Sequence, residues 1–334
     1  MAFVHITRRD CPMAAKEKTG NVAALELTDK QKKRKKTIKL IKQNYQLYFF
    51  LIPAIVFIVL FMYGPLYGLQ IAFKNYRPGK GIWGSDWIGF KWFLQFFSTP
   101  RCIEIIKNTL VVSIYSLIAG FPFPICLAII LNYVKNLRFK KFAQTVTYMP
   151  YFISTVVLVA MMNLFFSPSS GFINTMIKAC GGEPIYFMGI SNLFPHMYVW
   201  SGIWQSMGYS SIIYIAALSG VSPELHESAT IDGANILQRI WHIDIPTIMP
   251  TMIILLIMSC GNIMNVGYEK VFLMQNDLNI DASEVISTYV YKIGLVSQQY
   301  SFSTAIGLMN NVINFIILII ANKVSNKVFG SGLW

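Results

Sequence analysis

Six long apolar stretches divide most of the chain, and they constrain its fold more than any other feature. A helix needs about 20 mostly apolar residues to cross the hydrocarbon core of a bilayer. Windows of this length occur near residues 46–70, 108–133, 143–166, 194–219, 247–268 and 302–322. The sequence is 54% hydrophobic and only 13% charged, whereas a soluble domain carries about 25% charged residues. These observations predict an all-α membrane protein with about six transmembrane helices.

The placement of positive charge predicts the orientation, because Lys and Arg in short loops favour the cytoplasmic side. Twelve of the 28 Lys and Arg residues precede Asn44. More cations follow the second window at 135–141 and the sixth window at 323–327. With six spans these three regions share one side of the membrane, so both termini are expected in the cytoplasm. Segment 71–107 is then external, although its own basic residues weaken the rule there.

Two parts are therefore expected: a basic cytoplasmic tail over residues 1–43 and a transmembrane domain over residues 44–334. The domain leaves a cytoplasmic loop at 220–246, between the fourth and fifth spans. The net charge of +13 would suit nucleic acid, but its concentration in the tail favours contact with anionic membrane lipid. An acidic protein partner for the tail is the alternative.

Several classes of protein are disfavoured by what the residues lack. The five cysteines are scattered without metal-ligand spacing, which predicts no metal site. The apolar windows contain almost no ionisable residue apart from His196, whereas ion-coupled carriers usually keep one inside the membrane. The phosphate-binding pattern of ATPases is missing, and no nucleophile–base pair is apparent. We therefore expect a transport subunit, not an enzyme, that has no cofactor and draws its energy from another chain.

Uncharged polar side chains and aromatic rings inside the last three windows suggest a substrate path. Amides offer both donors and acceptors to hydroxyl groups, and rings offer faces on which sugars stack. The alternative is that these groups only hydrogen-bond one helix to another. The predicted path residues are Trp200, Gln205, Tyr209, Asn262, Asn265 and Tyr268.

Residues 223–250 resemble two short helices around a glycine. Ser222 can cap the first helix, and Gly233 permits a backbone conformation that most residues avoid. The second helix is expected over about 234–242, with Pro246 ending it before the fifth span. A compact helical projection of this kind suits docking into the groove of a partner.

This loop resembles the coupling motif of binding-protein-dependent transport permeases. The family pattern is E-A-A, three residues, G, nine residues, then I-x-L-P, and the sugar branch adds D-G-A around the glycine. The matching positions are Glu227, Ser228, Ala229, Asp232, Gly233, Ala234, Ile243, Ile245 and Pro246. Ser228 replaces an alanine and Ile245 a leucine, and both changes are conservative. Segments 288–294 and 302–325, with the chain end Gly332-Leu333-Trp334, are similar to permeases of alginate-type oligosaccharide importers.

The resemblance covers about residues 44–334 and implies the type I fold of ATP-driven importers in a bacterial cell membrane. It implies a second permease, usually in a heterodimer, two ATP-binding subunits and an extracytoplasmic solute-binding protein. Glu227 is then the charged contact to the ATPase, Gly233 allows the close turn, and Asp232 caps the second helix or bonds within the loop. The substrate is expected to be a carbohydrate, and the branch that the sequence resembles implies an oligosaccharide.

Other functions remain open at this point. The chain could be a permease for peptides or amino acids within the same family. It could instead be a secondary transporter or channel, or a membrane sensor that uses loop 220–246 to bind a signalling partner. The motif from Glu227 to Pro246 is the feature that separates these alternatives.

Overall fold

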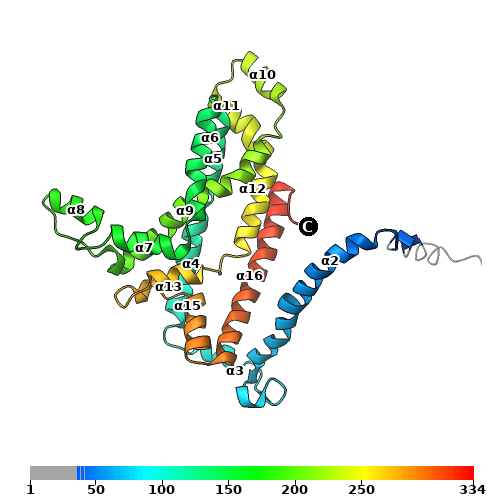
Figure 1. Ribbon diagram of the computed structural model, residues 1–334, viewed down its shortest axis with the longest axis vertical. Coiled ribbons are helices and arrows are strands. Elements are labelled where there is room, and N and C mark those ends of the chain that lie inside the picture. Colours follow the sequence, from blue (N-terminus) through cyan, green and yellow to red (C-terminus); the bar gives the residue numbers. More distant parts are fainter. Residues whose placement is uncertain (1–35, 38, 41) are drawn as a thin grey trace, which may run out of the picture. The chain divides into compact units, whose positions relative to one another are not determined.

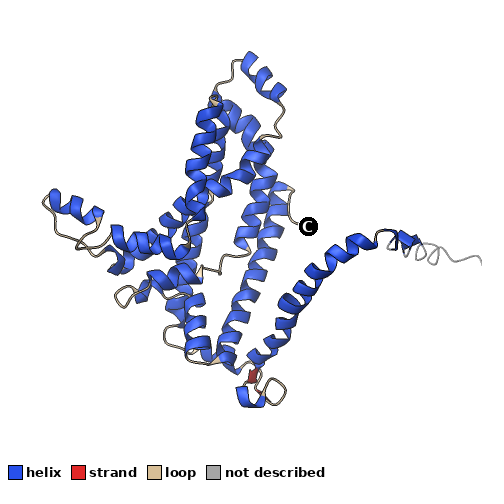
Figure 2. Cartoon of the chain, in the orientation of Figure 1, coloured by secondary structure: helices blue, strands red, loops and turns tan. Residues whose placement is uncertain are grey.

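The computed structural model describes residues 36, 37, 39, 40 and 42–334. Most of the basic tail predicted at 1–43 therefore lies outside the described residues. The chain divides into two units, residues 1–66 and 67–334. The described part is helical apart from one small hairpin and the connecting loops (Figure 2). This confirms the predicted all-α membrane fold.

The first unit contains the beginning of a candidate membrane span. Helix α2 (Tyr45–Ile58) continues through a wider π turn at Val59–Tyr63 into a 3₁₀ segment at Gly64–Phe73. Pro65 follows the π turn after one residue, Gly64. A proline cannot donate the usual helical hydrogen bond, and a π turn just before it adjusts the helix to that loss.

The second unit begins with short elements and then the longest span. Strands β1 (Lys74–Asn75) and β2 (Asp86–Trp87) form an antiparallel hairpin, and helix α3 (Lys91–Phe97) follows. Helices α4 (Cys102–Gly120) and α5 (Pro122–Tyr133) together form a candidate span of 32 residues.

The third window is not a straight helix. Helix α6 (Leu137–Tyr148) and a 3₁₀ turn at Met149–Phe152 meet α7 (Thr155–Phe165) at an angle of 96°. Helix α8 (Phe172–Ala179) and two short turns lead to α9 (Phe194–Leu218). The β-region backbone of Ile153 and Ser154 ends one helix, and the Ser154 hydroxyl caps the next.

Loop 220–246 contains α10 (Pro223–Ile231) and α11 (Ile236–Arg239) at one end of the second unit, opposite α3 (Figure 1). A π turn at Ile240–Asp244 then leads into α12 (Ile245–Cys260). The prediction that Pro246 ends the second loop helix is wrong, because Ile236–Cys260 is one continuous helical segment. Pro246 lies in the first turn of α12, and the π turn before it absorbs the missing backbone donor.

After α12 the chain forms three short helices and then one long helix. Helices α13 (Tyr268–Met274), α14 (Ile280–Ser283) and α15 (Ile286–Tyr291) precede α16 (Tyr300–Phe329). Within the described residues four helical segments are long and apolar enough to cross a membrane, or five if the bent α6–α7 pair counts as one span. Helix α9 matches the fourth predicted window and is 25 residues long, but its serines, glutamine and histidine make it more polar than those segments.

Buried apolar side chains hold α9 at the centre of the second unit. One cluster joins α5, α9 and α12 through Ile125, Tyr214 and Ile248. A second cluster joins α4, α7, α9 and α13 through Val112, Leu158, Phe194 and Val271. These contacts position α4, α9 and the end of α12 around a shared space.

Candidate functional site

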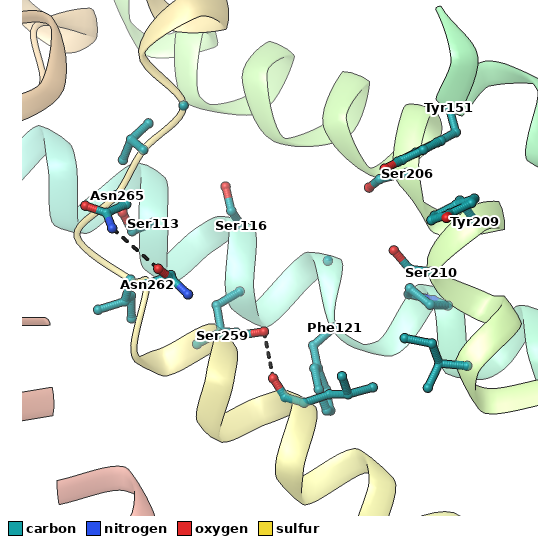
Figure 3. Close-up of a pocket in the computed structure, with 18 of the residues that line it drawn as sticks. Ser113, Ser116, Phe121, Tyr151, Ser206, Tyr209, Ser210, Ser259, Asn262 and Asn265 are labelled. Carbon is teal, nitrogen blue, oxygen red and sulfur yellow. Dashed lines mark hydrogen bonds between the residues drawn. The ribbon is translucent and has the colours of Figure 1, made fainter. Parts of the chain in front are cut away.

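A cavity of about 770 Å³ lies between α4, α5, α9 and the segment that follows α12. We call it the central cavity. None of the described residues that line it carries a charge, but many carry a hydroxyl, an amide or a tyrosine ring. Figure 3 shows two polar groups of side chains facing this space from different helices. The cavity can therefore offer hydrogen bonds and ring faces without an ion.

Amides form one side of the central cavity. Helix α12 ends at Cys260, and residues 261–267 have no regular helix. Asn265 Nδ2 donates to Asn262 Oδ1 at 3.4 Å, and Asn310 Nδ2 of α16 donates to Asn265 Oδ1 at 2.9 Å. Asn314 Oδ1, also from α16, accepts from the backbone N–H of Met264 at 2.9 Å. The buried asparagines of α16 thus hold the nonhelical segment in place and orient the amides beside the cavity.

Tyrosines form another part of the wall. The rings of Tyr151 and Tyr209 are stacked, with centroids 3.9 Å apart and planes 6° from parallel. Tyr209 belongs to α9, whereas Tyr151 belongs to the turn between α6 and α7. Ser206 and Ser210 lie next to Tyr209 along α9 (Figure 3). The bend of the third span therefore brings a ring to the cavity that a straight helix would place elsewhere.

A buried lysine contacts another tyrosine of this wall, Tyr198. Lys270 Nζ donates to the carbonyl oxygen of Tyr198 at 2.9 Å and lies 4.8 Å from the centre of the Tyr198 ring. The Tyr198 hydroxyl accepts from the backbone N–H of Gly267 at 3.2 Å. Burial lowers the pKa of Lys270 to about 8. Tyr198 itself lines the central cavity.

The six predicted path residues separate into two groups. Tyr209, Asn262 and Asn265 line the central cavity. Trp200 instead lines a second, apolar pocket, and Gln205 Nε2 donates to the carbonyl of Ile153 at 2.7 Å. Tyr268 packs against Phe272 and Tyr291. Gln205 is thus a structural tie between α9 and the bend, which is the alternative that the sequence left open for these groups.

Other cavity residues carried no sequence signal of their own. Tyr151 and Tyr198 lie in windows rich in aromatic residues, and the serines of α4 and α9 are ordinary components of membrane helices. Only the bend and the nonhelical segment, both tertiary features, bring them together. Among the described residues no group of three or more His, Cys, Asp or Glu side chains could hold a metal ion.

Loop 220–246 has a tight turn between two short helices. Gly233 has φ +80°, in the left-handed region that favours glycine. Asn235 and Gln238 exchange hydrogen bonds between side chain and backbone at the start of α11. Arg239 Nη1 then donates to Thr230 Oγ1 of α10 at 3.0 Å, which fixes the two helices to each other.

The expected caps differ from those observed. Ser222 occupies the position before α10 but makes no capping hydrogen bond with its side chain. Asp232 follows the last residue of α10, and Asn235, not Asp232, caps α11. The side-chain oxygen of Asn235 accepts from a free backbone N–H in the first turn of α11. A carboxylate is therefore not needed to cap this helix.

The motif residues surround a small cleft on this loop. The cleft has a volume of about 320 Å³ and includes Ala229, Asp232, Gly233, Ala234 and Ile243. Glu227 and Ser228 are exposed on α10, and Pro246 is exposed in the first turn of α12. Large apolar side chains are exposed nearby: Ile231 by 85%, Leu237 by 67% and Trp241 by 66%. This surface has the composition of a protein-docking site.

Comparisons with known proteins agree with this arrangement. Residues 124–330 match the family described as binding-protein-dependent transport system inner membrane component. The chain is 39% identical over 305 residues to the polygalacturonan/rhamnogalacturonan transport system permease protein YteP of Bacillus subtilis (strain 168), covering 91% of this chain and 95% of that relative. It is 38% identical to protein LplB of the same organism, covering 88% and 92%.

A solved structure has the same fold. It is a chain of a bacterial alginate ABC transporter, crystallised in complex with an alginate pentasaccharide-bound periplasmic protein. The TM-score is 0.81 with 38% sequence identity, and the match covers 88% of this chain and 99% of that chain. The likeness therefore extends over nearly the whole length of both proteins.

Proposed function

We infer that this chain, which belongs to the family of binding-protein-dependent transport system inner membrane components, is the permease subunit of a carbohydrate importer. The family places it in the membrane; one relative is named as a polygalacturonan/rhamnogalacturonan transport permease, and the solved structure is of an alginate transporter. The central cavity is the observation that carries the inference to the residues. It provides uncharged hydrogen-bonding groups and tyrosine rings from several helices.

The chemistry of the central cavity suits a saccharide. A sugar ring carries hydroxyl groups that both donate and accept hydrogen bonds. Amide and hydroxyl side chains can also donate and accept, so they can pair with these groups. Tyrosine faces can pack on the apolar faces of a sugar ring. We propose that Tyr209, Asn262 and Asn265 contact the passing saccharide, and that Tyr151 does so as well. An oligosaccharide is the favoured length, since the periplasmic protein of the alginate transporter carries an alginate pentasaccharide.

Loop 220–246 is proposed to dock into a separate ATP-binding subunit. Its support is the exposed apolar surface around Ile231 and Trp241, together with the motif from Glu227 to Pro246. ATP hydrolysis then takes place in two copies of that partner, and the loop transmits their movement. Gly233 permits the turn that presents α10 and α11 together, and Glu227 supplies an exposed carboxylate to the partner.

The other partners follow from the same proposal. One chain supplies only one wall of a path through the membrane, so a second permease is needed to close it, in a heterodimer. An extracytoplasmic solute-binding protein delivers the saccharide. The complex with a periplasmic protein in the alginate transporter supports this assembly.

The test is uptake by the complete importer in proteoliposomes, with a panel of neutral and uronic oligosaccharides as probes. Tyr209→Ala and Asn262→Ala each remove a side chain that faces the central cavity. Loss of one contact to the saccharide is expected to lower the uptake rate about tenfold. Each variant is compared with the wild-type importer at equal protein content.

Trp200→Ala is the matched control, because Trp200 lines the second pocket and not the central cavity. Its uptake rate is expected to stay near the wild-type value. Equal uptake by the wild type, both cavity variants and the control would contradict the proposed path. Wild-type uptake of peptides in place of every saccharide in the panel would overturn the substrate class.

A further inference from the structure

Asp244 is a fully buried carboxylate at the junction between loop 220–246 and the membrane spans. Its side chain has no exposed area, and it lies in the π turn that leads into α12. A buried carboxylate is costly unless partners surround it. The residues that contact Asp244 therefore show which helices its side chain connects.

Two partners come from elements that are distant in the sequence. The Tyr133 hydroxyl, at the end of α5, donates to Asp244 Oδ2 at 2.7 Å. His226 Nε2, on α10, lies 3.2 Å from Asp244 Oδ1, which is ion-pair distance, although Oδ1 accepts no hydrogen bond from the described residues. The carboxylate thus joins the end of one span and the first loop helix to the start of another span.

A cation completes this junction. The Arg239 guanidinium of α11 lies 5.8 Å from the centre of the Tyr133 ring and also donates to Thr230 of α10. The rings of Tyr133 and His226 meet edge to face at 6.3 Å. Tyr133, His226, Arg239 and Asp244 therefore come from α5, α10, α11 and the π turn, and we call them the junction cluster.

We propose that Asp244 is the positioning residue that makes α10 move together with α5 and α12. This inference rests on the proposed docking of loop 220–246 to an ATP-binding subunit. Force applied to α10 can reach the spans along the backbone or through side chains. Of the side-chain contacts of α10, that of His226 with Asp244 and Tyr133 reaches α5, whereas that of Thr230 with Arg239 stays within the loop. The backbone between α10 and the spans passes through the turns at Gly220 and Gly233, whereas the contacts of Asp244 link α10 directly to α5 and to the start of α12.

The first test measures transport and ATP hydrolysis in the complete importer, reconstituted with the oligosaccharide that the wild type transports best. Asp244→Asn keeps the shape of the side chain and removes its charge. ATP hydrolysis is expected to persist, while saccharide transported per ATP hydrolysed falls about tenfold, or about 1.4 kcal/mol of coupling. Glu183→Gln is the control, since Glu183 is an exposed carboxylate outside both loop 220–246 and the central cavity.

The second test needs no saccharide. Spin labels on cysteines placed at Glu224 of α10 and Leu137 of α6, both exposed, report the distance between the loop helix and the spans. The wild type and Glu183→Gln are expected to give one narrow distance distribution, and Asp244→Asn a broader one. His226→Gln is expected to broaden it as well, and the double variant to add nothing further, because the two side chains act as a pair.

The outcomes separate the two proposals. An unchanged transport-to-ATP ratio and an unchanged distance distribution in Asp244→Asn would overturn the role of Asp244. A wild-type importer that transports no saccharide would overturn the proposed function, while the spin-label measurement would still test the link between Asp244 and α10.

Discussion

Gly208 lies where α9 approaches α6 most closely. A Cβ atom at this position would overlap the backbone carbonyl of Thr147, so one helix must move to admit a side chain. The neighbouring α9 residues Gln205 and Tyr209 contact the bend of the third span. Close backbone approach at a small residue is a common way for membrane helices to pack.

Gly208→Ala is therefore expected to destabilise the protein by about 1–3 kcal/mol, the usual range for overpacking. The measurement is thermal unfolding in detergent, followed by intrinsic fluorescence. Gly307→Ala in α16 is the matched control, because its Cβ would meet no atom within 4 Å. Equal melting temperatures for the two variants would contradict the close contact.

Lys270 gives the protein a stability that depends on pH. Its ordinary pKa of 10.5 is lowered to about 8 in the folded chain by burial. The folded state therefore disfavours the ammonium form, and the full cost, roughly 3 kcal/mol, is present below about pH 8. Between about pH 8 and 10.5 the folded chain has lost a proton that the unfolded chain keeps. Stability is expected to rise with pH across this window.

Lys270→Met removes the buried charge, so it is expected to raise the melting temperature at pH 7 by roughly 5 °C. The gain should shrink at pH 10, where the wild-type lysine is largely neutral. Lys178→Met in α8, at an exposed position, should show no such dependence. A constant difference between Lys270→Met and the wild type from pH 7 to pH 10 would count against the lowered pKa.

At the scale of elements, hydrophobic length predicted where helices occur but not where they break. The third and fifth windows were both read as plain spans. The third is bent by 96°, and the fifth helix starts within loop 220–246 and ends at Cys260, before residues 261–267. Apolar composition does not distinguish a straight helix from a bent one, because both bury the same side chains.

The two breaks depend on contacts from other elements. Gln205 of α9 accounts for one by bonding the Ile153 carbonyl, and Asn310 and Asn314 of α16 account for the other. These partner residues are far away in the sequence from the breaks. The sequence around each break therefore does not predict it. For the same reason Tyr209, Asn262 and Asn265 were recognisable as candidates by residue type, while Tyr151 was not.

Loop 220–246 was more accessible to prediction. The turn at Gly233 and two flanking helices follow from local sequence, and the positive φ of Gly233 agrees with that expectation. The junction cluster was not anticipated. Asp244 and His226 are separated by 18 positions, and only the folded loop brings them within 3.2 Å.

For the whole molecule the remaining prediction is orientation. Loop 220–246 and the hairpin between β1 and β2 belong to opposite ends of the second unit (Figure 1). Positive charge predicts that the loop is cytoplasmic and the hairpin external. Ile231 is 85% exposed on the loop and Trp83 is 83% exposed on the hairpin, so a cysteine at either place should react readily.

In a variant without native cysteines, expressed without the ATP-binding subunit that would cover the loop, Ile231→Cys is expected to react with a membrane-impermeant maleimide only in inverted vesicles. Trp83→Cys should react in intact cells, and it serves as the opposite control. Modification of Ile231→Cys from outside the cell would reverse the predicted topology and remove the basis for docking to an intracellular ATPase.

The continuous helix from Ile236 to Cys260 has a consequence for how movement crosses the membrane. Its 25 residues correspond to a rod about 37 Å long, with Trp241 near one tip and Ser259, a wall residue of the central cavity, near the other. A rod pivoting near its middle swings both tips through similar arcs. Tilting the tip at Trp241 by a few degrees would therefore move the wall of the central cavity directly, with no relay of intermediate loops.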